Sequence, residues 1–198
     1  MNYVLYTDES PYKMQREWLD RLPFDIYSVN VHTGAKRLIG RSYRTAPKWS
    51  VNGKWAVMYD PIAQVWNKFD GATGKVVNIS DAIGYPMFME SYDKPAPAPA
   101  YGIAGWTADG NNVFLYDAYD WWKIDLTGER QPECLTKGYG RKHGKSIRKM
   151  TSNIDKDVFQ KDEKVIVSLW DKDTMDEGVY QLDMKGRLRK LMEGNYVY

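Results

Sequence analysis

An internal repeat limits the fold of this chain more than any other feature of its sequence. Four times, a run of alternating apolar and polar residues leads through a glycine-containing turn into a second such run. Glycine readily adopts the positive φ that tight turns require, so each copy predicts a β-hairpin. The copies cover residues 25–39, 65–79, 122–136 and 179–191, with turn glycines at positions 34, 74, 128 and 186.

A second repeated unit precedes two of these hairpins, because residues 47–60 align with residues 104–117. The turn pairs Asn52-Gly53 and Asp109-Gly110 are strong signals for a tight hairpin. Weaker copies of the strand that follows lie at 3–8 and 165–171. The complete repeat therefore has four strands, as a β-propeller blade does.

The turn glycines are 40, 54 and 58 residues apart. Propeller repeats have periods of about 40 to 50 residues, so the longer intervals indicate insertions. We predict an all-β fold, a partial β-propeller of about four four-stranded blades that forms a single unit over residues 1–198. The blades are expected at approximately 1–40, 41–82, 102–136 and 158–192, and the insertions at 10–24, 84–101 and 137–157.

The insertions are expected to be mostly loop. Alternating prolines in residues 94–101 favour an extended segment that cannot donate sheet hydrogen bonds. Residues 137–160 are rich in glycine and lysine. Residues 14–22 are compatible with two helical turns before Pro23, and we expect little other helix.

Composition argues against several classes of function. The chain has 28 Lys and Arg against 26 Asp and Glu, and a net charge of +2 gives no general attraction to nucleic acid or to an anionic membrane. No apolar run approaches the roughly 20 residues that span a bilayer, and the first residues form a strand-like pattern rather than a secretory signal. A cytosolic protein, a mature exported one and a piece of a longer chain all remain open. The single cysteine, Cys134, has no cysteine partner for a disulfide or a zinc site.

The serines and histidines do not lie in the sequence patterns expected of catalytic residues. None of the nine serines lies in the Gly-x-Ser-x-Gly turn of a hydrolase nucleophile. The histidines are His32 and His143, and His32 is expected in an exposed hairpin turn where other copies carry Ala72 and Leu126. We therefore predict no catalytic residue in this chain.

Two loops resemble ligand-binding motifs without completing them. Residues 138–146 end in Gly-Lys-Ser, but a phosphate-binding loop needs glycine at the position of Tyr139, so a solvated basic loop is favoured over a nucleotide or nucleic-acid site. Residues 171–178 resemble a calcium loop, but Met175 stands where a ligand is required, which favours an exposed hairpin connection. We expect no cofactor and no metal.

The acidic pairs and most of the tryptophans are expected to have structural roles. Asp8 with Glu9, or Asp117 with Asp120, would suit glycoside chemistry, but turn and strand-end roles are favoured. The eight tryptophans include the adjacent pair 121–122, whose side chains must point to opposite faces of a strand, so at most one stacks on a ligand. Core packing is favoured for most tryptophans, notably those at the equivalent positions 49 and 106. Ligand-binding residues stay unknown, and any binding is expected at the loops 84–101 and 137–149.

The repeat resembles the propellers of TolB-like domains and of prolyl oligopeptidase family serine peptidases, including the large enzymes of this type in Bacteroidetes. The resemblance covers nearly the whole chain and rests on residues 49–54, 64–67, 73–80, 102–107, 116–122 and 135–142. It implies a non-catalytic propeller that gates substrate access to, or scaffolds, an α/β-hydrolase domain absent from this chain. It further implies a peptide substrate and a periplasmic or secreted parent protein.

Two other functions remain open from the sequence. The runner-up is a stand-alone TolB-like module that binds a protein or glycan, and the third is a small enzyme that uses acidic residues. As for closure, three blades look nearly complete and a fourth looks split between the termini, since 195–198 resemble the start of a blade. The chain would then close as a compact four-bladed ring or, as we favour, as an eight-bladed homodimer.

Overall fold

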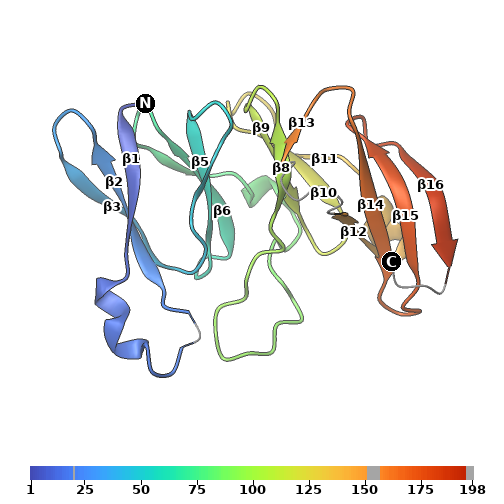
Figure 1. Ribbon diagram of the computed structural model, residues 1–198, viewed down its shortest axis with the longest axis horizontal. Coiled ribbons are helices and arrows are strands. Elements are labelled where there is room, and N and C mark those ends of the chain that lie inside the picture. The colour runs from blue at the N-terminus through green and yellow to red at the C-terminus, as the bar shows by residue number, and fades with distance from the viewer. Residues whose placement is uncertain (20, 151–156, 195–198) are drawn as a thin grey trace.

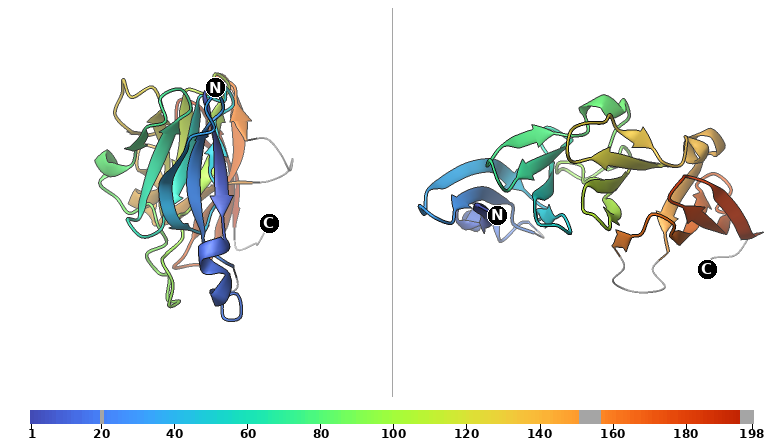
Figure 2. Two further views of the ribbon diagram at one scale, coloured as in Figure 1. Left: turned by 90° about the vertical axis from the view of Figure 1, so that its left-hand side faces the viewer. Right: turned by 90° about the horizontal axis from the view of Figure 1, so that it is seen from above.

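In the computed structural model, which describes residues 1–19, 21–150 and 157–194, the chain forms four β-sheets that follow one another along an open arc (Figures 1 and 2). The first and fourth sheets lie at opposite ends of this arc. Over the described residues, no strand of the fourth sheet pairs with the first. The described chain is therefore a partial β-propeller, as predicted, and not a closed four-bladed ring. Residues 195–198, which the closure prediction invokes, lie outside the described residues.

The first two sheets are antiparallel and use their strands in chain order. The first has three strands, β1 (Tyr3–Asp8), β2 (Phe24–Asn30) and β3 (Lys36–Tyr43). The second has four, β4 (Lys48–Trp49), β5 (Trp55–Asp60), β6 (Val65–Asp70) and β7 (Val76–Asn78). The second sheet thus contains the complete predicted repeat, whereas the first begins with what corresponds to its second strand.

The third and fourth sheets are interleaved along the chain, because the strand that follows the first strand of the fourth sheet pairs in the third. The third has the order β11-β10-β9-β8-β13, with β8 (Ile103–Thr107), β9 (Asn112–Tyr116), β10 (Trp121–Asp125), β11 (Glu133–Cys134) and β13 (Val158–Phe159). The fourth has the order β12-β14-β15-β16, with β12 (Lys145–Lys149), β14 (Lys164–Asp171), β15 (Glu177–Asp183) and β16 (Leu188–Gly194). The pair β8 and β13 is parallel, whereas the other strand pairs in the named sheets are antiparallel.

The expected limits of the fourth blade are therefore wrong at its start. Its first strand, β12, lies inside the expected insertion 137–157, and β13, expected to open the blade, pairs with the third sheet. Strand β12 cannot be recognised from an alternation of apolar and polar residues, because Ile147 is its only apolar residue. Strand β13 approaches β8 at Gly105, where an added Cβ would lie 2.5 Å from the ring of Phe159.

The turn glycines behave as predicted. Gly34, Gly74, Gly128 and Gly186 have φ values of 70°, 71°, 85° and 80°, in the left-handed region that glycine accepts most easily. The two equivalent inner turns also touch, because the Asn52 side-chain amide donates to the main-chain oxygen of Asp109 at 2.8 Å. The repeat thus fixes both the hairpins and a contact between neighbouring sheets.

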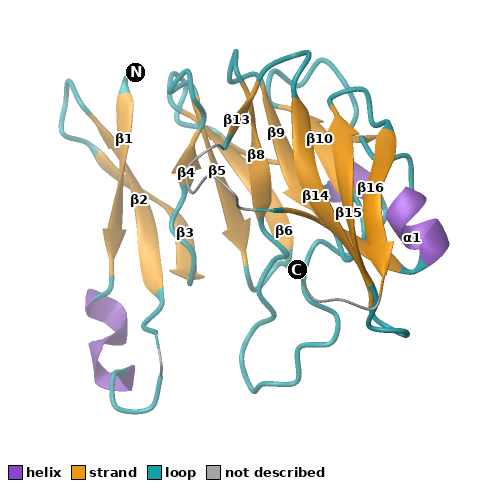
Figure 3. Ribbon diagram, turned by 45° about the vertical axis from the view of Figure 1, so that its right-hand side comes forward, coloured by secondary structure: helices purple, strands orange, loops and turns teal. Residues whose placement is uncertain are grey.

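Three short helices occur in the described residues. They are the 3-10 helices η1 (Ser10–Gln15) and η2 (Asp81–Ile83), and α1 (Tyr139–His143), which lies beside the fourth sheet (Figure 3). The helical turns expected over 14–22 are wrong, because η1 starts earlier, with Pro11 in its first turn, and ends at Gln15. Residues 84–101 form a loop that projects beyond the sheets (Figure 1), closed by the bridge between Phe88 and Ala100. No helix in the described residues is long and apolar enough to cross a membrane.

Within the part of the chain that the structure describes, the core consists of three apolar clusters between neighbouring sheets. Phe69 and Ile26 lie in the cluster of the first two sheets, and the other two clusters flank the third sheet. Trp121 belongs to one of these and Trp122 to the other, which confirms that the pair points to opposite faces and packs in the core. Adjacent sheets are therefore held face to face, as propeller blades are.

Candidate functional site

The turn between β9 and β10 connects the third sheet to the helix α1 through two buried carboxylates, Asp117 and Asp120. The Asp120 carboxylate accepts hydrogen bonds from the Thr136 hydroxyl at 2.6 Å and from the main-chain N–H groups of Gly140 and Arg141 at 2.9 and 3.0 Å. This turn therefore fixes the start of α1 against the third sheet.

Asp117 completes the same connection with its side chain. Its carboxylate accepts hydrogen bonds from Trp122 Nε1 at 3.1 Å and from the Arg141 guanidinium at 2.9 Å, and from N–H groups of its own turn. Every oxygen of both carboxylates thus receives a donor. This confirms the turn role expected for the pair, and it leaves neither acid free for the proton transfers of glycoside hydrolysis.

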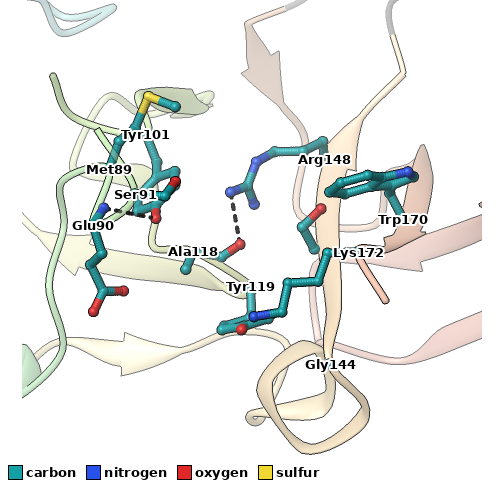
Figure 4. Close-up of a pocket in the computed structure, with 11 residues that line it drawn as sticks. Met89, Glu90, Ser91, Tyr101, Ala118, Tyr119, Gly144, Arg148, Trp170 and Lys172 are labelled. Atoms are coloured by element: carbon teal, nitrogen blue, oxygen red, sulfur yellow. Dashed lines mark hydrogen bonds between the residues drawn. The ribbon is translucent and has the colours of Figure 1, made fainter. Parts of the chain in front are cut away.

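A cavity of about 440 Å³ lies beside this turn, between the third and fourth sheets (Figure 4). The projecting loop contributes Glu90 and Met89 to its wall, and the β9–β10 turn contributes Tyr119. The fourth sheet contributes Arg148 from β12 and Trp170 from β14. The cavity therefore joins the two loop segments, 84–101 and 137–149, at which binding was predicted.

Arg148 is the cation enclosed most deeply in this wall. Its guanidinium donates to the main-chain oxygens of Ile147 and Asp117 at 2.8 Å and of Ala118 at 3.1 Å. It also lies 5.4 Å from the ring centre of Tyr101 and 4.7 Å from that of Tyr116. Burial lowers the pKa of Arg148 and raises the pKa of Tyr116 to about 12. The carbonyl and ring contacts hold the charged group in place.

A second, smaller cavity of about 390 Å³ lies on the other side of the turn. Arg141 forms part of its wall, with its guanidinium carbon 3.9 Å from the ring centre of Tyr85 and 5.1 Å from that of Tyr119. Lys172 Nζ approaches Tyr119 from the first cavity, 5.7 Å from the ring centre. Tyr119 therefore contacts a cation of each cavity. Of these two cavities, only the first has an excess of basic side chains, since Asp117 and Asp120 balance Arg141 and Lys142 in the second.

The two histidines line neither cavity, whereas the glycine-rich motif 138–146 contributes Gly144 and Ser146 to the wall of the first cavity and Gly138 to that of the second. His32 is exposed in the turn between β2 and β3, and His143 is exposed at the end of α1, where its ring centre lies 4.4 Å from that of Tyr139 with the rings tilted by 38°. Gly138 and Gly144 flank the five residues of α1 as its caps. The described residues contain no group of three or more His, Cys, Asp or Glu side chains suited to a metal ion.

The acidic loop is a hairpin connection, as expected. The Asp171 carboxylate accepts hydrogen bonds from the N–H groups of Asp173 and Thr174 at 3.0 and 3.2 Å, within the turn from β14 to β15. The same strand carries the cavity residue Trp170, which sequence reasoning missed. Two features of the sequence could have indicated Trp170. It lies near the end of a predicted strand, and it is followed two residues later by the basic residue Lys172.

Comparisons with known proteins find similar folds and no family. No protein-family model matches the sequence, and no curated protein matches it. Solved structures that resemble the chain include a putative TolB from Agrobacterium tumefaciens, with 14% identity and a TM-score of 0.47 over 97% of this chain and 61% of that one. The chain thus spans less than two thirds of that protein.

Two peptidase propellers are also similar. The acylaminoacyl peptidase of Pyrococcus horikoshii matches with 14% identity and a TM-score of 0.44 over 98% of this chain and 31% of that one. The β-propeller domain of the Trilobed protease from Pyrococcus furiosus matches with 13% identity and a TM-score of 0.37 over 96% of this chain and 68% of that one. Similarity at this level concerns the course of the chain, and the chain's own residues must carry any argument about function.

Proposed function

We propose that this chain is a non-catalytic propeller module that binds extended peptide segments at the cavity between its third and fourth sheets. The observation that carries the proposal is the convergence of aromatic and basic side chains from three separate segments on one cavity. The loop 84–101, the β9–β10 turn and the fourth sheet each contribute to it. Cavities of about 300 to 1,000 Å³ with a few placed polar groups are typical of binding sites.

In a longer protein, we further propose, such a module restricts which peptides reach a serine hydrolase domain of the prolyl oligopeptidase type. The support is the sequence resemblance described above and the position of the loop 84–101, which projects past the sheets beside the cavity (Figure 1). The module itself carries no Gly-x-Ser-x-Gly turn. Its contribution to catalysis would therefore be selection of the substrate.

Peptide binding is tested with a synthetic random dodecapeptide library passed over the immobilised chain. We expect a retained set of sequences, and we expect Trp170→Ala to lose most of the retention because Trp170, 39% exposed, lines the cavity. The matched control is Trp18→Ala, which removes a tryptophan that is 70% exposed and lies before β2 in the first sheet. Equal loss in both variants, or no retention by the folded chain, would contradict the proposal.

The absence of catalysis is tested separately. The pure chain is incubated with chromogenic dipeptide substrates and with a serine-directed fluorophosphonate probe, and we expect neither hydrolysis nor labelling. Stoichiometric labelling of any serine would overturn the non-catalytic assignment. Retention of glycans instead of peptides would favour the stand-alone binding module.

A further inference from the structure

We propose that the cavity between the third and fourth sheets recognises a carboxylate next to an aromatic or apolar side chain of the bound peptide, through Arg148 and Lys172. This inference rests on the proposed function and adds the chemical class of its ligand. The carboxylate would come from the end of a peptide or from an acidic side chain. Both sources present the same two oxygens to a guanidinium.

The first step concerns the charge of Arg148. The described structure gives its guanidinium hydrogen bonds to three main-chain oxygens and to no carboxylate. The two acids of the adjacent turn are engaged elsewhere, because Asp117 directs its carboxylate to Arg141, and that of Asp120 accepts hydrogen bonds from Thr136 and from N–H groups of α1. A charge enclosed by protein is stabilised most by an ion of opposite sign with which it shares hydrogen bonds. An incoming carboxylate would supply that ion.

The second step concerns the balance of charge across the cavity. Lys172, exposed at the rim, has no salt bridge with another described residue, and Glu90 is the acid in the same wall. Two cations facing one carboxylate leave the cavity positive. Glu90 is held on the loop, where its N–H group donates to the Tyr101 hydroxyl at 3.4 Å (Figure 4). The cavity therefore favours an anion even though the chain as a whole is nearly neutral.

The third step concerns the surface beside these cations. The rings of Tyr101 and Tyr119 and the indole of Trp170 lie around the charged groups (Figure 4). Aromatic rings give contact area to an apolar or aromatic group of the ligand, whereas a site for a bare anion has no use for such rings. The combination selects a carboxylate attached to an apolar group over inorganic anions.

Isothermal titration with three probes on the full chain tests the inference. N-acetylphenylalanine offers a terminal carboxylate, N-acetyl-aspartyl-phenylalanine amide offers a side-chain carboxylate, and N-acetylphenylalanine amide offers neither. We expect one or both acids to bind roughly tenfold or more tightly than the neutral amide, as hydrogen bonds to charged groups predict. The acid that binds more tightly identifies the source of the carboxylate.

Two variants connect this preference to the named residues. Arg148→Met should abolish it, and Lys172→Gln should reduce it several-fold while leaving the amide unaffected. Lys75→Gln is the matched control, since it removes an exposed lysine from the turn before β7, away from the cavity. If Arg148→Met unfolds, Lys172→Gln and the salt dependence of the wild-type preference provide the test, because ionic screening must weaken it.

The outcomes separate the two proposals. If retained library peptides bind but neither acid is preferred over the amide, or if Lys172→Gln and added salt leave the preference unchanged, carboxylate recognition is wrong and the proposed function stands. If the folded chain retains no peptide and binds none of the probes, the proposed function itself is wrong. Sulfate competing as well as the acids would also overturn the inference, because it would show a bare anion site.

Discussion

The indole Nε1 of Trp121 donates a hydrogen bond to the main-chain oxygen of Ile147 at 3.1 Å, so that a side chain of the third sheet holds the first strand of the fourth. Trp66 occupies the equivalent place in the second sheet. The N–H of Trp66 donates to the Ser80 hydroxyl at 2.9 Å, and that of Trp121 donates to the Thr136 hydroxyl at 3.1 Å. The indole of Trp66, in contrast, is buried with no described hydrogen-bond partner.

This pair gives the first prediction. Trp121→Phe should lower the free energy of unfolding by about 0.5–1.5 kcal/mol more than Trp66→Phe, because it removes one hydrogen bond to the Ile147 oxygen and leaves only the one from the Arg148 guanidinium. Both substitutions remove a similar volume from a buried site, so Trp66→Phe serves as the packing control. The measurement is urea unfolding followed by circular dichroism. Equal losses would show that the hydrogen bond contributes nothing to the contact between the sheets.

The second prediction concerns Gly186 in the turn between β15 and β16. Its φ is +80°, and an added Cβ would overlap the main-chain oxygen of Leu135, the residue that follows β11 of the third sheet. Gly34, at the equivalent turn, has φ +70° and nothing within 4 Å of such a Cβ. Gly34→Ala should therefore lose about 1–2 kcal/mol from backbone strain alone, and Gly186→Ala about 1–3 kcal/mol more from crowding. Matched losses in urea unfolding would contradict the close contact.

The third prediction is a pH dependence of stability. The Glu193 carboxylate in β16 accepts hydrogen bonds from Lys145 in β12 at 2.5 Å and from Lys190 at 3.0 Å. The hydrogen bond from Lys145 has the largest effect, and together these contacts lower the pKa of Glu193 from its ordinary 4.5 to about 2. A lowered carboxylate pKa stabilises the folded state above the unfolded value and loses that effect as pH falls through the folded value.

The free energy of unfolding should accordingly fall between pH 4.5 and about 2, and Glu193→Gln should lose part of this dependence. Glu133→Gln is the control, because Glu133 is an exposed glutamate of β11 without a salt bridge to another described residue. Urea titrations at several pH values provide the measurement. An unchanged slope in Glu193→Gln, or the same change in both variants, would argue against the contact with Lys145.

The fourth prediction concerns the open end of the arc. The first sheet has three strands, and its edge strand β1 exposes Val4 and Tyr6. Unpaired edges with exposed apolar side chains favour association, so we expect two chains to pair end to end. Light scattering should then give about 46 kDa, twice the chain mass of 23.0 kDa. Tyr6→Lys should shift the chain to the monomer, and a wild-type monomer at micromolar concentration would refute the dimer.

The sequence was sufficient to predict the hairpins because their information is local. A glycine at each turn and alternation in each strand specify a hairpin whatever surrounds it. Strand β12 was missed because four of its five residues are polar or charged, and its place depends on pairing with β14. The pairing of β13 with β8 depends on a two-residue contact at Gly105, which no local pattern reveals.

The sequence singled out two segments that border the candidate cavity, where binding stays a prediction, but not the side chains that line it. The two segments named for binding do meet at the cavity, because insertions leave the sheets at their turns. Which side chains face it depends on how the third sheet packs against the fourth. Arg148, for example, belongs to a run of basic residues that predicts a solvent-exposed loop. Its contacts with the main-chain oxygen of Ala118 and the ring of Tyr101 show that it is enclosed.

Strand β13 has a consequence for how this chain can change over evolutionary time. Tandem repeats are gained and lost as whole units when each unit is self-contained. Here the chain leaves the fourth sheet after β12, supplies the edge of the third with β13, and returns to the fourth with β14. Deleting the segment that holds the fourth sheet would remove β13 from the third, and deleting β8 to β11 would leave β13 without its partner strand. These two blades must be inherited together, whereas the second sheet, with all four strands in one continuous stretch, remains free to be duplicated or exchanged.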